Sequence, residues 1–232
     1  TDCVTFDPKG KILQIDYAKE AVKQGSTSLG LKSNTHVVLV SLKKSPHDLA
    51  AFQEKVFFID DHMGIAISGL TADARFLCNF MRNECLNYEF VHENTHPTER
   101  LINKISKKAQ VKTCSGNKRP FGVGLLVGSY DEAGTHLFET CPSANYYEYN
   151  AMAIGARCQS AKTYLEKNFE AFPTLGWEEL VRHGIKALRA SAQEVDLTVK
   201  NVSVGVVGKD TPFRTLSEED LRSYIDENQM DT

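Results

Sequence analysis

The chain has 232 residues, of which 41% are hydrophobic and 25% charged, and its formal net charge is −3. These values are ordinary for a globular protein, and they exclude the strongly basic balance that favours nucleic acid or anionic membranes. Because no apolar run reaches the ~18 residues of a membrane span, we expect neither a membrane segment nor a signal peptide. No Pro/Gly/Ser-rich linker divides the chain, so we treat residues 1–232 as one domain.

The first predicted element is a turn followed by a helix, over residues 6–25. The segment DPKG at residues 7–10 places Asp, Pro and Gly where a type I turn prefers them. Behind it, apolar residues recur at helical spacing and form one stripe: Ile15, Ala18, Ala21 and Val22. Gly25 suits the left-handed position that often follows a helix.

The helix ends directly against a run of hydroxyl residues, Ser26, Thr27 and Ser28, at the start of a predicted strand. One class of hydrolases uses a hydroxyl residue at a chain start as nucleophile, with its own free amine as base. Here Ser26 carries a peptide nitrogen, which is no base. Catalysis would therefore require cleavage before Ser26 or Thr27. Thr1 precedes the turn and not a core strand, so we do not assign it this role.

Paired strands then alternate with paired helices along the chain. We expect Thr71 to cap the first of these helices, with Asp73 in its first turn, and Ser217 and Asp220 to form a capping box on the last one. This alternation argues against a doubly wound parallel sheet and favours two packed antiparallel sheets with helices on both outer faces, although periodicity alone leaves other orders open. The expected strands are residues 28–32, 36–42, 55–59, 63–68, 123–130, 135–139, 146–149, 152–154 and 202–206.

Residue identities within 6–25 add to this pattern. They resemble the N-terminal signature of the alpha-type subunits of the 20S proteasome, and Asp16 replaces the usual Glu. The resemblance continues to about residue 226. The matching signature residues are Phe6, Pro8, Gly10, Gln14, Tyr17, Ala18, Glu20, Ala21 and Gly25, and the later matching blocks are residues 69–86, 119–124, 140–146, 153–166 and 202–210.

The resemblance implies an α+β fold, the four-layer αββα sandwich of the N-terminal nucleophile hydrolases. It also implies a non-catalytic subunit of a seven-membered alpha ring, stacked on beta-type rings that hold the active sites. The expected partners are other alpha-type subunits, beta-type subunits, regulatory particles and unfolded substrates in transit, in the cytoplasm and nucleus. We expect no nucleic acid or membrane partner.

The resemblance also implies roles for Lys55 and Leu42. Lys55 aligns with the lysine that activates the nucleophile in beta-type subunits. In alpha-type subunits this position lines a pocket between neighbours and receives the C-terminal carboxylate of an activator tail, for which an ammonium group is suited. Leu42 stands where beta-type subunits carry a helper Asp. From pattern alone, Lys55 could equally be a solvated lysine at a strand edge.

Four residues of the first segment receive further roles by resemblance. Pro8 and Tyr17 are expected to hold the N-terminal tail over the ring pore, although the pattern alone indicates only a turn proline and an amphipathic aromatic residue. Ala18 and Ala21 are expected to permit close approach between neighbouring subunits.

The sequence predicts no metal site and no cofactor. No C-x-x-C pair occurs, and the histidines lack a metal-ligand spacing. The sequence alone leaves disulfides open, and we expect reduced thiols, as in an intracellular protein. The glycines of residues 122–128 miss the spacing of a dinucleotide-binding loop and indicate close sheet packing instead. The six cysteines are Cys3, Cys78, Cys85, Cys114, Cys141 and Cys158.

Overall fold

The computed structural model describes residues 4–45, 47, 49–192 and 195–230, so Thr1 lies outside the described residues. The elements in chain order are α1 (Leu13–Gln24), β1 (Ser28–Lys32), β2 (His36–Leu42), β3 (Val56–Asp60), β4 (Met63–Gly69), α2 (Thr71–His92), α3 (Thr98–Thr113), β5 (Val123–Asp131), β6 (Gly134–Thr140), β7 (Tyr146–Glu148), β8 (Ala151–Ile154), α4 (Cys158–Asn168), a short 3-10 turn (Phe172–Thr174), α5 (Trp177–Ser191), β9 (Val202–Gly208), β10 (Thr211–Thr215) and α6 (Glu218–Met230). No helix of the described residues is long and apolar enough to cross a membrane.

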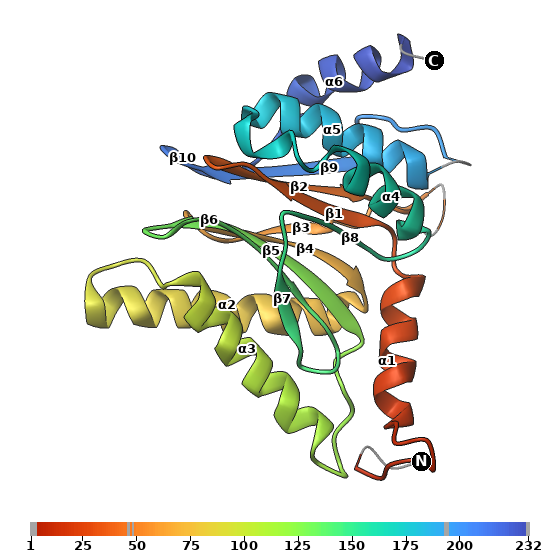
Figure 1. The fold of residues 1–232 in the computed structure, drawn as a ribbon, viewed down its shortest axis with the longest axis vertical. Helices are drawn as coiled ribbons and strands as arrows, with labels where there is room; N and C mark the ends of the chain where they lie inside the picture. Colours follow the sequence, from red (N-terminus) through yellow and green to blue (C-terminus); the bar gives the residue numbers. More distant parts are fainter. Residues whose placement is uncertain (1–3, 46, 48, 193–194, 231–232) are drawn as a thin grey trace.

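The strands form two five-stranded sheets that face each other. One sheet has the order β10-β9-β2-β1-β8 and the other β3-β4-β5-β6-β7, and the neighbouring strands pair antiparallel. Helices α4, α5 and α6 cover the outer face of the first sheet, and α2 and α3 lie beyond the second (Figure 1). The predicted αββα sandwich is therefore confirmed. Helix α1 stands at one end of the sandwich, where it packs on β4 and β5.

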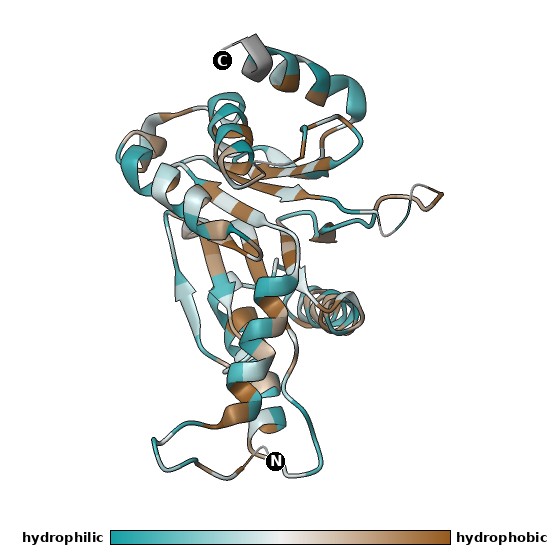
Figure 2. Cartoon of the chain, turned by 90° about the vertical axis from the view of Figure 1, so that its right-hand side faces the viewer, coloured by the Kyte–Doolittle hydropathy of each residue, from teal (hydrophilic) through white to brown (hydrophobic). Residues whose placement is uncertain are grey.

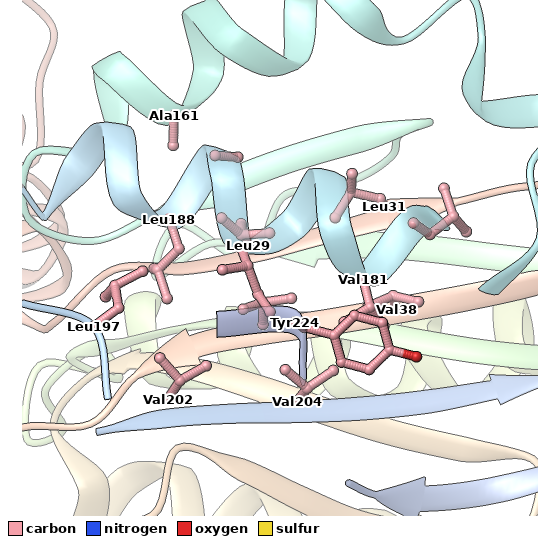
Figure 3. Packing of buried hydrophobic residues seen from close by; sticks show 14 of the residues in the cluster. Leu29, Leu31, Val38, Ala161, Val181, Leu188, Leu197, Val202, Val204 and Tyr224 are labelled. Atoms are coloured by element: carbon pink, nitrogen blue, oxygen red, sulfur yellow. The ribbon is translucent and has the colours of Figure 1, made fainter. Parts of the chain in front are cut away.

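The core follows the period-two alternation of the strands. In β2, Val38 and Val40 face α5, whereas Val37 and Leu39 face the other sheet. Strand β5 does the same, because Leu125 packs with α2 and α3 and its neighbour Leu126 lies between the sheets. Brown hydrophobic segments gather in the strands at the centre of the molecule, and the outer helices carry much hydrophilic surface (Figure 2). Figure 3 shows the layer between α5 and the first sheet.

The start of α2 differs from the prediction. Leu70 holds the cap position, and Thr71 is the first helical residue, with no side-chain cap. The Thr71 hydroxyl instead accepts a hydrogen bond from Gln53 Nε2 (2.8 Å). Asp73 lies in the first turn as expected, but its carboxylate binds the Arg119 guanidinium (2.6 Å). This pair ties α2 to the segment before β5.

The capping box of α6 is confirmed. Asp220 N donates to Ser217 Oγ (3.2 Å), and Ser217 N donates to Asp220 Oδ2 (3.2 Å). Leu216 and Leu221, on either side of the cap, are both buried in the cluster beneath α5. The C-terminal helix is thereby fixed to the outer layer of the sandwich.

The end of α1 also differs from the prediction. Gly25 has φ −65° and ψ 153°, which is extended backbone that any residue could adopt. The need for glycine is steric, because a Cβ at this position would lie 2.2 Å from Gly69 N and 2.4 Å from Ser68 Oγ. Gly25 therefore permits α1 to end in direct contact with the end of β4.

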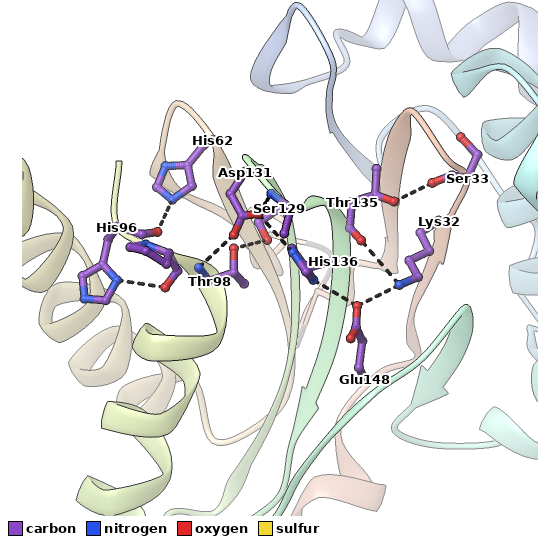
Figure 4. A network of polar contacts seen from close by, with 12 residues as sticks. Lys32, Ser33, His62, His96, Thr98, Ser129, Asp131, Thr135, His136 and Glu148 are labelled. Carbon is purple, nitrogen blue, oxygen red and sulfur yellow. Dashed lines mark hydrogen bonds and ion pairs between the residues drawn. The ribbon is translucent and has the colours of Figure 1, made fainter. Parts of the chain in front are cut away.

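A chain of polar side chains links the two sheets at the edge opposite β10 and β3. Lys32 Nζ of β1 contacts Glu148 Oε1 of β7 (2.8 Å), and the same oxygen contacts His136 Nδ1 (3.0 Å). His136 Nε2 in turn contacts Asp131 Oδ1 (3.1 Å). Figure 4 shows this network. The Asp131 carboxylate raises the pKa of His136.

Candidate functional site

The junction between α1 and β1 is held by hydrogen bonds on both sides of the Gly25–Ser26 peptide. Ala156 N donates to Gly25 O (2.7 Å), and Ser68 Oγ donates to Ser26 O (3.1 Å). The same Ser68 hydroxyl contacts Val22 O (2.9 Å), the last turn of the helix. The nitrogen of Ser26 is thus an amide inside ordered, packed chain.

The hydroxyls that follow are occupied in structural bonds. Thr27 Oγ1 donates to Ala156 O (2.6 Å). Ser28 Oγ donates to Ile67 O (2.8 Å) and accepts from Ser41 Oγ (2.8 Å), which ties β1 to both sheets. Ser26 Oγ is buried and has no hydrogen-bond partner among the described residues. The one hydroxyl with no structural bond therefore has neither a free amine nor another base bonded to it.

A cavity of about 180 Å³ lies beside this junction. Thr27 and Leu42 line it from the first sheet, and Ala156 and Ser191 line it from the side of α4 and α5. None of the described residues around the cavity carries a carboxylate. Leu42 stands at the position of the helper Asp expected in beta-type subunits, and it is buried, with 4% of its surface exposed. The described lining therefore offers no carboxylate for activating a hydroxyl, and its charged residues are Lys44 and Arg157.

Lys55 lies just before β3 and is 5% exposed. Among the described residues, no carboxylate comes within ion-pair distance of its ammonium group. Its neighbour Lys43 differs, because it pairs with Glu54 (3.3 Å). Burial, and then the charge of Lys44, lower the pKa of Lys55. Lys55 is thus largely buried and has no carboxylate partner among the described residues, and it does not line the cavity beside Thr27.

The turn before α1 forms as predicted and leaves its proline in solvent. Gly10 N donates to Asp7 O (2.9 Å), and Asp7 Oδ1 accepts from the backbone amides of Lys9 (2.9 Å) and Lys11 (2.8 Å). Pro8 is exposed, and the Tyr17 side chain is 57% exposed. Both residues lie on the part of the chain that projects past the sheets in Figure 1.

Helix α1 itself is lightly covered. None of its residues is fully buried. Ala21 faces the chain's own Gly122, where a Cβ would lie 3.6 Å from the Ala21 methyl, and Ala18 is half-buried. Two ion pairs lie on its polar face, between Asp16 and Lys19 (3.8 Å) and between Glu20 and Lys23 (2.6 Å). The helix therefore keeps much of its surface free.

Two facing antiparallel sheets between helical layers, with a hydroxyl residue at the start of a central strand, define the N-terminal nucleophile hydrolase fold. A family model described as "Proteasome subunit" matches residues 22–207. The chain belongs to the proteasome subunit family.

The names of three similar proteins indicate which type of proteasome subunit the chain resembles. Proteasome subunit alpha type-1 of Dictyostelium discoideum is 53% identical over 227 residues, covering 97% of this chain and 92% of that protein. The Drosophila melanogaster protein of the same name is 44% identical over 239 residues, covering 100% and 86%. Proteasome subunit alpha type-6 of Saccharomyces cerevisiae is 44% identical over 226 residues, covering 97% of each chain. The chain thus resembles alpha-type subunits that are named type-1 in two of these organisms and type-6 in the third.

Ser68 is a positioning residue that sequence reasoning did not find. Its hydroxyl binds the carbonyls on either side of Gly25, yet it lies more than forty residues away within β4. A single serine in a buried strand has no sequence signature. Only the contact with Gly25 shows its role.

We predict that the hydroxyls of Ser26 and Ser28 differ in their contribution to stability. Ser26→Ala should not lower the free energy of unfolding, because the buried Ser26 hydroxyl has no hydrogen bond to lose among the described residues. Ser28→Ala should lower it by about 1–3 kcal/mol, because Ser41 Oγ loses its buried acceptor and Ile67 O loses a donor. Denaturant unfolding of the purified chain measures both. Equal losses would contradict the hydrogen-bond assignment.

Proposed function

We propose that this chain is a non-catalytic subunit of the outer alpha ring of the 20S proteasome. The observation that carries the proposal is the Gly25–Ser26 peptide, which is held within packed chain where a catalytic subunit would need a free amine. The family match and the names of the relatives support it.

In this proposal the contribution to proteolysis is geometric. The chain joins other alpha-type subunits in a seven-membered ring, stacks on beta-type subunits, and helps form a gated pore for unfolded substrates. Pro8 and Tyr17 act in the gate, since both are exposed on the projecting N-terminal segment. Regulatory particles dock on the ring in ubiquitin- and ATP-dependent degradation, in the cytoplasm and nucleus. Residues 1–232 act as one domain and need no cofactor for this role.

The alternative is an N-terminal nucleophile hydrolase that matures by cleavage before Ser26 or Thr27. Such cleavage would remove α1, which packs on β4 and β5, and would expose the surface that this helix covers. The new amine would still face a cavity lined by Leu42 and no carboxylate among the described residues. These features disfavour the alternative.

We propose that α1 mediates contacts between neighbouring ring subunits. A helix of 12 residues with no fully buried side chain gains little stability from its own chain, because tertiary burial supplies most helical stability. Its exposed surface includes Tyr17, and Phe6 just before it is 67% exposed. Ala21 contacts its own sheet at Gly122, whereas Ala18, one turn earlier on the same stripe, is half-buried and keeps part of its surface for close approach of a neighbour.

We predict that Ala18→Arg reduces incorporation into assembled particles by at least about tenfold, because a long charged side chain cannot be buried in a close contact without a partner. Gln24→Arg is the matched control, since it adds the same group at an exposed position of the same helix. Native mass spectrometry of purified particles measures incorporation. Normal assembly of the Ala18→Arg chain would contradict the contact.

We also propose that Lys55 binds the C-terminal carboxylate of an activator tail, in a pocket completed by the neighbouring subunit. A buried ammonium without a countercharge gains more from an incoming carboxylate than a solvated or already paired lysine does. The lowered pKa of Lys55 has the same origin, because burial penalises the charged form until an anion is present.

We predict that Lys55→Ala weakens binding of a tail-bearing activator to this pocket by about tenfold or more, while the ring still assembles. Lys43→Ala is the control, because Lys43 is already paired with Glu54. Binding of a synthetic tail peptide to assembled particles is read out by crosslinking to this subunit, which separates this pocket from the others of the ring. Equal crosslinking of the two variants would contradict the role of Lys55.

A further inference from the structure

A second cluster of chemically active side chains lies on the opposite side of the second sheet from Ser26, where the β3–β4 turn meets α2. One donor atom each of Asp60, His62 and Cys85 lies within 4.8 Å of the others. His62 and Cys85 are 8% and 3% exposed, and Asp60 is partly exposed. The cluster is therefore buried, with one carboxylate open to solvent.

The hydrogen bond of His62 fixes which ring nitrogen carries the proton. Nε2 lies 3.0 Å from the backbone carbonyl of His96 (Figure 4), and a carbonyl only accepts, so Nε2 donates. In the neutral ring, Nδ1 then presents a lone pair toward Asp60 Oδ2, 3.1 Å away. When the ring is protonated, Nδ1 and this oxygen form an ion pair, and the hydrogen bond with His62 lowers the pKa of Asp60.

Two electron-pair donors that face each other in a buried place repel unless a cation lies between them. Zinc is bound in proteins by imidazole nitrogen, thiolate and carboxylate oxygen, the three donors found here. Histidine ligands of metals donate their other ring N–H to a carbonyl or carboxylate, as His62 does to His96. The donor set and its surrounding hydrogen bond thus match a metal site.

We propose that Asp60, His62 and Cys85 bind a zinc ion, with water as the fourth ligand. Zinc bonds of about 2.0–2.3 Å separate tetrahedral ligand atoms by roughly 3.5 Å. The nitrogen and oxygen already have nearly this spacing, at 3.1 Å, and the sulfur lies within 4.8 Å of both. Cys85 would bind as thiolate and release its proton to solvent. This site is independent of the proposed ring function.

No sequence pattern indicates this site, and the spacing of the cysteines argues against one. Asp60 and His62 are separated from Cys85 by most of a helix, and no C-x-x-C pair is present. Helix α2 returns along the sheet and brings Cys85 under the turn. Burial raises the pKa of the Cys85 thiol to about 12, which accounts for an inert thiol in the absence of metal.

The test uses the full chain titrated with Zn²⁺ and with Co²⁺. We expect one equivalent of Co²⁺ to produce a thiolate charge-transfer absorption that Zn²⁺ displaces. Cys85→Ser should weaken binding by at least about tenfold and abolish this absorption. Cys78→Ser is the matched control, because Cys78 is equally buried on the same helix but lies outside the cluster. It should bind like the wild type.

A second variant protects the test against misfolding. Because Asp60 is partly exposed, Asp60→Asn should leave the helical circular dichroism of the chain unchanged. It should also weaken Zn²⁺ binding. Zn²⁺ should raise the unfolding temperature of the wild type and of Cys78→Ser only. Absence of the charge-transfer band in the wild type would overturn the proposal. Equal binding by the wild type and Cys85→Ser would place the ion elsewhere and overturn it as well.

Discussion

The close contact between the end of α1 and the end of β4 is the constraint on which the functional surface depends. At Gly25 the two segments approach so closely that a single methyl group would meet the backbone of Gly69. Ser68 secures the contact by binding the carbonyls of Val22 and Ser26. The prefix is thereby part of the folded structure, and the amide of Ser26 cannot act as the free amine of a nucleophile. The same contact places α1 at one end of the sandwich, where its outer side is free.

Burial of a charged or metal-binding group marks two of the sites to which we assign functions. The hydroxyls of Thr27 and Ser28 donate hydrogen bonds to carbonyls of other segments, and the Asp73 carboxylate binds Arg119. Lys55 has no such partner among the described residues, so it is suited to an external anion. The Nδ1 atom of His62 faces the Asp60 carboxylate at 3.1 Å, and a cation between the two atoms would satisfy both. The carboxylate proposed for Lys55 and the zinc ion proposed for His62 each supply the electrostatic partner that a buried polar group requires.

Much of the fold was predictable because its layers follow local periodicity. The apolar run from Val123 to Tyr130 indicated a strand covered on both faces, and it forms β5 between two hydrophobic clusters. The features that were missed depend on tertiary contacts. Position 25 requires glycine because β4 approaches it closely, and its own dihedral angles would suit any residue. Leu70, and not Thr71, holds the cap position of α2. The cluster around Cys85 has no spacing signature, since α2 brings it to the β3–β4 turn only in the folded chain.

The central claim is that the segment before Ser26 stays attached in the working protein. The most direct measurement is the intact mass of this subunit, released from purified, active particles. The account predicts a chain that includes residues 6–25, with unchanged peptide hydrolysis by particles that carry Ser26→Ala. A chain that begins at Ser26 or Thr27 would contradict it, and the loss of a hydrolytic activity in the Ser26→Ala particles would identify this subunit as a protease.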